Sequence, residues 1–142
     1  LKKKKIKPKF FLGTDISEEM IKICKIKFTK EKKILFKHYN ILGKNKISKM
    51  DFVLTSGIFN VKNSFSNSIW KDYVFETISK MYQISNKGIG FNFLTFDTTF
   101  RDKKLFYMSI DELIRFLRKK ISKKIIIHHD YELWEYTVFV YK

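Results

Sequence analysis

Polar residues that could hold a ligand follow two apolar segments of this sequence. Asp15 comes directly after the apolar run 10–14, and Ser56 and Gly57 come at the end of the run 51–56. In open sheets of parallel strands, ligands bind beyond the carboxyl ends of the strands. A carboxylate at such an end can accept hydrogen bonds from both hydroxyls of a ribose, which is one interpretation of Asp15. The other is that Asp15 only ends its strand and caps the following helix.

A second polar group lies near the C-terminus, where His128, His129 and Asp130 are consecutive. Histidine titrates near neutral pH and a carboxylate can orient it, so the group could supply a general base or a metal site. Adjacent residues of a strand point to opposite faces, however, so two such histidines do not easily share one ligand. We therefore favour a structural or substrate-rim position and predict no bound metal. If the reaction requires a base, His129 and Asp130 are the candidates.

Two further residues that could do chemistry receive structural interpretations. Asn92 lies inside a largely apolar segment, where it could bond neighbouring backbone or face a pocket, and we favour the bond to backbone. Cys24 lies on the apolar stripe of a predicted helix, so we expect it in the core. As the only cysteine of the sequence, it excludes an internal disulfide and a cysteine-based metal site.

Length and composition predict one soluble domain. The chain has 142 residues, of which 44% are hydrophobic and 31% charged, and these fractions exclude wholesale disorder. No run of 18 apolar residues occurs, so we expect no membrane span. No charged-then-apolar leader opens the sequence, and the single cysteine fits a reducing compartment. The expected location is therefore the cytoplasm.

The net charge of +16 raises the question of a nucleic-acid partner. Of the 30 basic residues 27 are lysines, whereas arginine, which suits phosphate and base-edge recognition, occurs three times, at Arg101, Arg115 and Arg118. Alanine is absent, and lysine, isoleucine, phenylalanine, asparagine and tyrosine make up more than half of the chain. A/T-rich codons explain this bias without a polyanionic partner. Nucleic-acid binding is thus possible but not favoured.

The hydrophobic pattern predicts strands that alternate with amphipathic helices. Strands are expected at 10–14, 34–39, 51–56, 89–96, 125–129 and 136–141. Helices are expected over about 18–29 after Ser17 as N-cap, over about 68–84, and after a capping box of Ser109 and Glu112. A turn is expected at 86–88, because asparagine and glycine are frequent in turns.

This order of elements predicts the fold class. Strands separated by helices favour a parallel sheet, and the last two strands, which have no helix between them, favour an antiparallel pair. We therefore predict an α/β, Rossmann-like fold: a mostly parallel sheet with helices on both faces and an antiparallel C-terminal strand pair.

Two segments resemble motifs of one known family. The segment Phe11–Ile21 (FLGTDISEEMI) is similar to the second-strand motif of class I S-adenosylmethionine-dependent methyltransferases, and Met50–Asn60 (MDFVLTSGIFN) is similar to the fourth strand of that family. The resemblance covers the chain from about residue 10 to its end. It implies S-adenosylmethionine as the cofactor and methyl transfer to a small-molecule acceptor.

The resemblance also implies roles for residues in the first part of the chain. Asp15 would accept the ribose hydroxyls of the cofactor, and Ile16 would lie against the adenine. Asn40, followed by Ile41, occupies the position at which the family often has an acid that bonds the adenine amino group. An asparagine can still accept this bond through its amide oxygen, with weaker binding as the expected result.

Further roles fall on the segment after the run 51–56. Ser56 and Gly57 would run beside the methionine part of the cofactor. Phe59 and Asn60 would border the transferred methyl group and the substrate. For Asn60 a second interpretation is equally open, namely that it forms a turn.

The sequence departs from the family at its N-terminus. The first strand of the family and its Gly-x-Gly-x-Gly loop precede the Asp15 motif, whereas this sequence has lysines there and its first glycine is Gly13. We therefore expect residues 1–142 to be a single, partial methyltransferase domain, a fragment that is inactive alone. Residues 1–9 are expected to be a lysine-rich tail or the end of a helix.

Three functions remain open at this point. The leading one is S-adenosylmethionine-dependent methyl transfer, as part of a longer chain, with acceptor choice in the loops 63–67 and 97–104. Methyl transfer from a sulfonium needs no metal, because the leaving group is neutral and in-line positioning supplies much of the rate. The alternatives are a non-catalytic scaffold of the same fold and a basic nucleic-acid-binding module.

Overall fold

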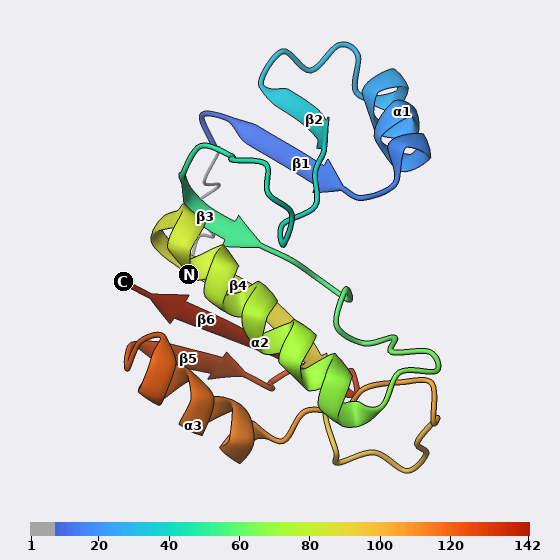
Figure 1. Ribbon diagram of the computed structural model, residues 1–142, viewed down its shortest axis with the longest axis vertical. Coiled ribbons are helices and arrows are strands. Elements are labelled where there is room, and N and C mark those ends of the chain that lie inside the picture. The colour runs from blue at the N-terminus through green and yellow to red at the C-terminus, as the bar shows by residue number, and fades with distance from the viewer. Residues whose placement is uncertain (1–7) are drawn as a thin grey trace. The chain divides into compact units, whose positions relative to one another are not determined.

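The computed structural model describes residues 8–142, drawn in colour in Figure 1. The predicted lysine-rich tail over residues 1–9 falls almost entirely outside that range. The contacts divide the chain into two compact units, one that ends at Asn45 and one that begins at Lys46. Each unit is described by itself below. The nine predicted elements are all present, in the predicted order.

The first unit is a β–α–β arrangement. Strand β1 (Phe11–Asp15) pairs in parallel with β2 (Ile34–His38), and helix α1 (Glu18–Lys27) connects them. The predicted helix start is confirmed: the Ser17 side chain accepts a hydrogen bond of 3.2 Å from the backbone N–H of Met20. Two acids in the first turn interact favourably with the helix dipole. Cys24 is half-buried, not enclosed in a core.

The second unit contains a four-stranded sheet in the order β3-β4-β6-β5. Its strands are β3 (Met50–Leu54), β4 (Ser85–Leu94), β5 (Ile125–His128) and β6 (Glu135–Tyr141). Strands β3 and β4 are parallel, whereas β6 is antiparallel to both β4 and β5. The antiparallel C-terminal pair is thus confirmed. The predicted mostly parallel pairing is confirmed in part, because two of the four pairings within residues 8–142 are parallel.

The predicted turn at 86–88 is wrong, because these residues belong to β4. Gly88 pairs with Tyr141 of β6, and the Lys87 carbonyl accepts a hydrogen bond of 3.0 Å from the backbone N–H of Lys142. A Cβ atom at position 88 would lie 2.7 Å from the Val140 carbonyl oxygen. The glycine therefore permits close approach of a neighbouring strand, a tertiary requirement that looks like a turn signal in sequence.

Helices α2 (Asn67–Ile84) and α3 (Ile110–Lys120) lie side by side on one face of this sheet (Figure 1). The rings of Phe75 and Phe116 stack between them with centroids 3.9 Å apart. Helices were predicted on both faces of the sheet, and within this unit both cover the same face. Alternate side chains of β4 and β6 are buried at the sheet: Ile89, Phe91, Phe93, Tyr136, Val138 and Val140.

The capping box predicted before α3 is only half correct. Ser109 is the N-cap residue, but its side chain makes no capping hydrogen bond. Glu112 instead forms an ion pair with Lys71 of α2, with Nζ and Oε1 2.7 Å apart. A partner 41 residues away in the sequence therefore takes the carboxylate that the local pattern assigns to the helix start.

The phenol of Tyr136 gives a first test of the core. Its ring is fully buried and its hydroxyl donates a hydrogen bond of 2.9 Å to the Met108 carbonyl. Replacing Tyr136 with phenylalanine should lower the free energy of unfolding by about 0.5–1.5 kcal/mol at pH 7, measured by urea titration.

The same variant tests the effect of burial on ionisation. Burial raises the pKa of Tyr136 above the ordinary tyrosine value, so the folded state holds this proton more tightly than the unfolded state. This contribution to stability is present below about pH 10 and declines as the pH rises further. Stability should therefore fall more steeply above pH 10 in the parent chain than in Tyr136→Phe. Equal slopes in the two proteins would contradict this.

Candidate functional site

In the first unit, Asp15 lies at the carboxyl end of β1 with its side chain exposed. Its Oδ1 accepts a hydrogen bond of 2.8 Å from the backbone N–H of Ser17, which is itself the N-cap residue of α1, so Asp15 ends the strand but does not cap the helix. This bond does not exhaust the side chain, because an ionised carboxylate offers about four lone-pair positions. The second oxygen can still accept hydrogen bonds from a ligand.

Asn40 and its neighbours lie beyond the end of the adjacent strand. Asp15 pairs with His38, the last residue of β2, and Asn40 follows two residues later. The Asn40 Oδ1 accepts a local hydrogen bond of 3.0 Å from Leu42 N, and Ile41 is half-buried. The structure thus places Asp15 and Asn40 at the ends of adjacent strands.

Ile16 is an exposed hydrophobic residue beside Asp15. Its side chain is 72% exposed, directly after the carboxylate of Asp15. Its carbonyl oxygen is bonded to the His38 ring at 2.9 Å, which fixes the backbone at this point. An exposed aliphatic side chain beside a carboxylate offers an apolar surface against which a flat ring could pack.

In the second unit, Ser56 and Gly57 form an open turn beyond β3. Gly57 has a φ of +74°, a left-handed conformation that favours glycine. No atom lies within 4 Å of the position that a Cβ would take there, so the conformation and not lack of space requires glycine. Ser56 is exposed. The backbone here is accessible to a ligand.

Asn92 of β4 holds this turn in place. Its side chain is 6% exposed, and its Oδ1 accepts a hydrogen bond of 2.8 Å from Gly57 N. Its Nδ2 donates to Glu135 Oε2 of β6 at 2.6 Å. The predicted bond from Asn92 to backbone is confirmed. Local spacing in the sequence does not indicate the role of Glu135, because its partner is 43 residues away.

Phe59 lies in the core of the second unit. Its ring is fully buried, stacked on Phe93 with centroids 5.2 Å apart and edge-on to Phe91 at 6.3 Å. Its carbonyl oxygen accepts a hydrogen bond of 2.8 Å from the indole N–H of Trp70. The ring therefore anchors the loop after Gly57 to the core and offers no exposed surface to a ligand.

Asn60 closes a turn, as one of its two interpretations predicts. Its N–H donates to the Gly57 carbonyl at 3.2 Å, and its own carbonyl accepts from Phe106 N at 2.9 Å. The side-chain Oδ1 is buried and has no hydrogen-bond partner within residues 8–142. A buried acceptor of this kind is costly unless a partner arrives. The Asn60 backbone thus forms the turn, and its side-chain oxygen is left without a partner.

His129 and Asp130 lie at the same edge of the four-stranded sheet as the Gly57 turn, but farther along it. They follow β5, which is three strands away from β3, a separation of roughly 14 Å at the usual strand spacing. Asp130 lies near His128, with Oδ1 and Nδ1 3.7 Å apart and both side chains exposed, whereas the His129 ring lies beside Tyr136 at 6.4 Å. The structure does not bring this pair to the Gly57 turn.

Two further features concern the part of the chain that the structure describes. It contains no group of three or more histidine, cysteine, aspartate or glutamate side chains that could hold a metal ion. Between residues 8 and 142, no helix has the length and apolar character needed to cross a membrane.

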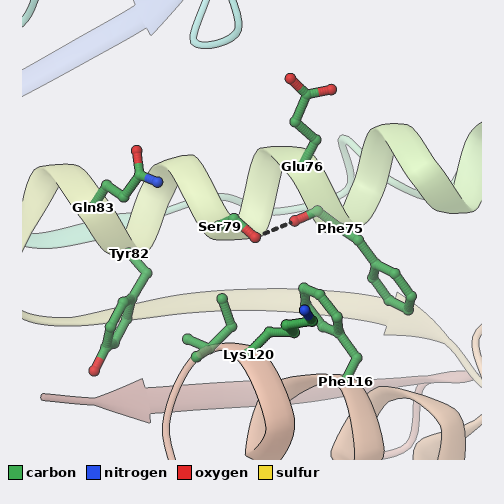
Figure 2. Close-up of a pocket in the computed structure, with 8 residues that line it drawn as sticks. Phe75, Glu76, Ser79, Tyr82, Gln83, Phe116 and Lys120 are labelled. Atoms are coloured by element: carbon green, nitrogen blue, oxygen red, sulfur yellow. Dashed lines mark hydrogen bonds between the residues drawn. The ribbon is translucent and has the colours of Figure 1, made fainter.

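An open groove of about 410 Å³ lies between α2 and α3, and Figure 2 shows it. The stacked rings of Phe75 and Phe116 and the side chains of Tyr82 and Lys120 line it. Its one internal hydrogen bond in the figure joins Ser79 Oγ to the Phe75 carbonyl at 2.8 Å, an ordinary bond within a helix. None of the predicted site residues lines this groove.

Known proteins resemble this chain in sequence and in fold. No profile of a known family matches the sequence. A protein of Mycobacterium tuberculosis (strain ATCC 25618 / H37Rv) named "Putative methyltransferase Rv1506c" is 28% identical over 134 residues, which are 93% of this chain and 78% of that protein.

Solved structures of methyltransferases have the same fold. The magnesium protoporphyrin IX methyltransferase of Synechocystis PCC 6803 with bound S-adenosylhomocysteine superposes with a TM-score of 0.68 at 12% identity, over 94% of this chain and 64% of that one. The methyltransferase domain of the citrinin polyketide synthase gives 0.67 at 11% identity, over 92% and 38%. The chain thus spans less than two thirds of each structure. The predicted resemblance is confirmed: this chain has the fold of the class I S-adenosylmethionine-dependent methyltransferases.

Proposed function

We propose that this chain acts in methyl transfer from S-adenosylmethionine to a small-molecule acceptor. The observation that carries the proposal is the end of β1, where the exposed Asp15 carboxylate has free acceptor positions beside the exposed Ile16 side chain. A hydroxylated sugar attached to a flat base matches this pair of surfaces. The methyltransferase fold and the 28% identical relative support the same assignment.

In the first unit, Asp15 would accept the ribose hydroxyls and Ile16 would pack against the adenine. Asn40 would accept from the adenine amino group through Oδ1, which already takes one bond from Leu42 N and has a second lone pair. The half-buried Ile41 would add apolar contact. Sharing of the Asn40 oxygen should weaken this contact compared with a carboxylate.

In the second unit, the backbone of Ser56 and Gly57 would run beside the methionine part of the cofactor. The open space at Gly57 suits close approach of a ligand to the main chain. S-adenosylmethionine, when bound, supplies a methyl group on a sulfonium that leaves as a neutral thioether. The unpaired Asn60 Oδ1 would accept a hydrogen bond from the acceptor, and Phe59 would support Asn60 from the core.

The acceptor must lose a proton if its methylated atom is a hydroxyl oxygen or an amine nitrogen. His129 is our candidate for this base, and Asp130, which follows it in the sequence, has its carboxylate beside His128. Replacing His129 with glutamine should then lower the rate of methyl transfer. An unchanged rate would assign His129 to the rim of the site only.

Cofactor binding can be tested by calorimetric titration of the chain with S-adenosylhomocysteine. We expect weak, saturable binding that raises the melting temperature by mass action. Asp15→Asn keeps an oxygen for the Ser17 N–H but loses the charge, so the fold should persist while affinity falls about tenfold or more.

Asp72→Asn is the matched control, because Asp72 is an exposed acid of α2 and the substitution removes the same charge. Its affinity for S-adenosylhomocysteine should equal that of the parent. Equal affinities for Asp15→Asn and Asp72→Asn would remove Asp15 from the proposed site, and an absence of any binding by the parent would remove cofactor binding from the chain.

A further inference from the structure

Two loops of the second unit pair with each other beyond the carboxyl ends of β3 and β4. One follows the Gly57 turn and the other follows β4. Val61 and Leu105 form an antiparallel bridge, and the N–H groups of Lys62 and Asn63 both donate to the Lys104 carbonyl, at 2.9 and 3.0 Å. These bonds fix the loops as one structural element. They include the segments 63–67 and 97–104, in which we expect acceptor choice.

The loops line a cavity of about 510 Å³ that is open to solvent and has the size of a small-molecule site. Phe96 and Tyr107 line it as a pair of rings with centroids 6.1 Å apart, and Leu105 adds an aliphatic surface. The Tyr107 hydroxyl accepts a hydrogen bond of 3.1 Å from Asp102 N, which fixes its ring. One wall of the cavity is therefore apolar and aromatic, with its two rings tilted by 43°.

The other wall is cationic. Lys62, Arg101 and Lys103 line the cavity, and none of them takes part in an ion pair found among residues 8–142. The one acid of the lining, Asp102, uses its Oδ1 to accept a hydrogen bond of 2.7 Å from Lys104 N. Three cations and one carboxylate leave an excess of positive charge facing the cavity.

Arg101 is held in position for binding. Its Nη2 donates to the Phe96 carbonyl at 2.6 Å, and its guanidinium carbon lies 4.8 Å from the centre of the Phe96 ring. A guanidinium has five N–H donors in a rigid fork, so this bond leaves donors free for an oxyanion. Lys62 is also restrained, with Nζ donating to the Phe65 carbonyl at 3.2 Å.

The N-terminus of α2 adds to the positive charge that faces the cavity. Asn67, the first residue of this 18-residue helix, lines the cavity. The first turn of α2 contains no acid, so the positive end of its dipole is not neutralised from within the helix.

We propose that this cavity binds an oxyanion of the methyl acceptor, a phosphate or a carboxylate, whose attached ring lies against Phe96 and Tyr107. The proposal rests on the proposed function only where it identifies the bound molecule as the methyl acceptor. The cavity is connected to the proposed methyl-transfer site through the sequence, because Asn60, with its unpaired Oδ1, precedes Lys62 in the same loop. Acceptors of this enzyme would thus be anionic molecules that contain a ring.

The probes are phenyl phosphate and benzoate, titrated into the full chain at fixed ionic strength and followed by amide chemical shifts. We expect saturable shifts at loop residues 60–67 and 96–107, and at least tenfold weaker binding of the neutral analogue benzyl alcohol. The stronger of the two probes identifies the preferred oxyanion. Phenyl phosphate or benzoate that shifts only residues outside these loops would overturn the proposal.

A chain of net charge +16 attracts anions everywhere, so the variants must remove equal charge at different places. Arg101→Gln should weaken binding of the preferred probe about tenfold. Lys103→Gln, at an exposed side chain, tests the same wall without loss of a structural hydrogen bond. Arg115→Gln is the control, because Arg115 is exposed on α3 and does not line the cavity. Equal losses in the Arg101 and Arg115 variants would overturn the site.

Two parallel titrations separate this proposal from its alternatives. Arg101→Gln should leave affinity for S-adenosylhomocysteine unchanged. If the parent chain binds the probe but not S-adenosylhomocysteine, the cavity proposal stands and the proposed function fails.

A single-stranded oligonucleotide is the ligand of the second titration. If it binds far more tightly than phenyl phosphate and Arg115→Gln weakens it as much as Arg101→Gln does, the cavity is part of a nucleic-acid surface and the proposal fails.

Discussion

Replacing Phe59 with alanine should lower the free energy of unfolding by about 3–5 kcal/mol. The ring is fully buried and packs on Phe91 and Phe93, so truncation removes apolar contact and leaves a cavity that rigid strands cannot fill. Urea titration, monitored by tryptophan fluorescence, would measure this loss of stability, because the Trp70 indole donates a hydrogen bond to the Phe59 carbonyl.

A matched control comes from the same loop. Phe65 is 53% exposed and contacts the Trp70 ring at a centroid distance of 5.9 Å, so Phe65→Ala should cost less than about 1 kcal/mol. Phe59→Leu keeps most of the volume and should lie between the two alanine variants. If Phe59→Ala cost no more than Phe65→Ala, the ring would not belong to the core, and its role would be contact with a ligand.

Local patterns in this sequence predict local structure well. Ser17 followed by two acids specifies the start of α1, because the hydrogen bond and the dipole interaction lie within one turn. The alternation of apolar strands and amphipathic helices likewise specifies the order of all nine elements. Where one residue contacts its own neighbours in sequence, type and spacing are sufficient.

Predictions failed where a distant partner decides the structure. Gly88 resembles a turn residue until β6 is placed beside it, and Glu112 resembles a capping acid until α2 brings Lys71 within 2.7 Å. In the candidate site, Asp15 could be found from the end of an apolar run. The cavity lined by Lys62 and Arg101 could not, because these residues belong to two loops that pair only in the folded chain.

The Asn92 amide should contribute more to stability than a single hydrogen bond, because it bridges two elements. Asn92→Leu would lose the bond to Gly57 N and leave the Glu135 carboxylate without its amide donor. We expect a loss of roughly 2–4 kcal/mol in the free energy of unfolding, since bonds to charged groups are the stronger kind. A loss below 0.5 kcal/mol would contradict the bridging role.

Asn92→Asp separates the two bonds of this bridge by their response to pH. The new carboxylate keeps an oxygen for Gly57 N but faces the Glu135 carboxylate across a contact that is 2.6 Å in the parent. Two carboxyl groups at this distance share a proton, so the pKa of one of them should rise in the folded state. A raised folded pKa gives stability that is present at low pH and is lost as the pH rises through that value.

The penalty of Asn92→Asp relative to the parent should therefore be large at pH 7 and shrink toward pH 4, as urea titrations at several pH values would measure. Asn86→Asp is the control, because Asn86 is an exposed residue of the same strand and its penalty should not shrink in this way. A penalty for Asn92→Asp that is constant between pH 4 and 7 would mean that Glu135 has moved away from position 92. The Gly57 turn would then depend on the amide oxygen alone, and β6 would have no part in holding the proposed cofactor loop.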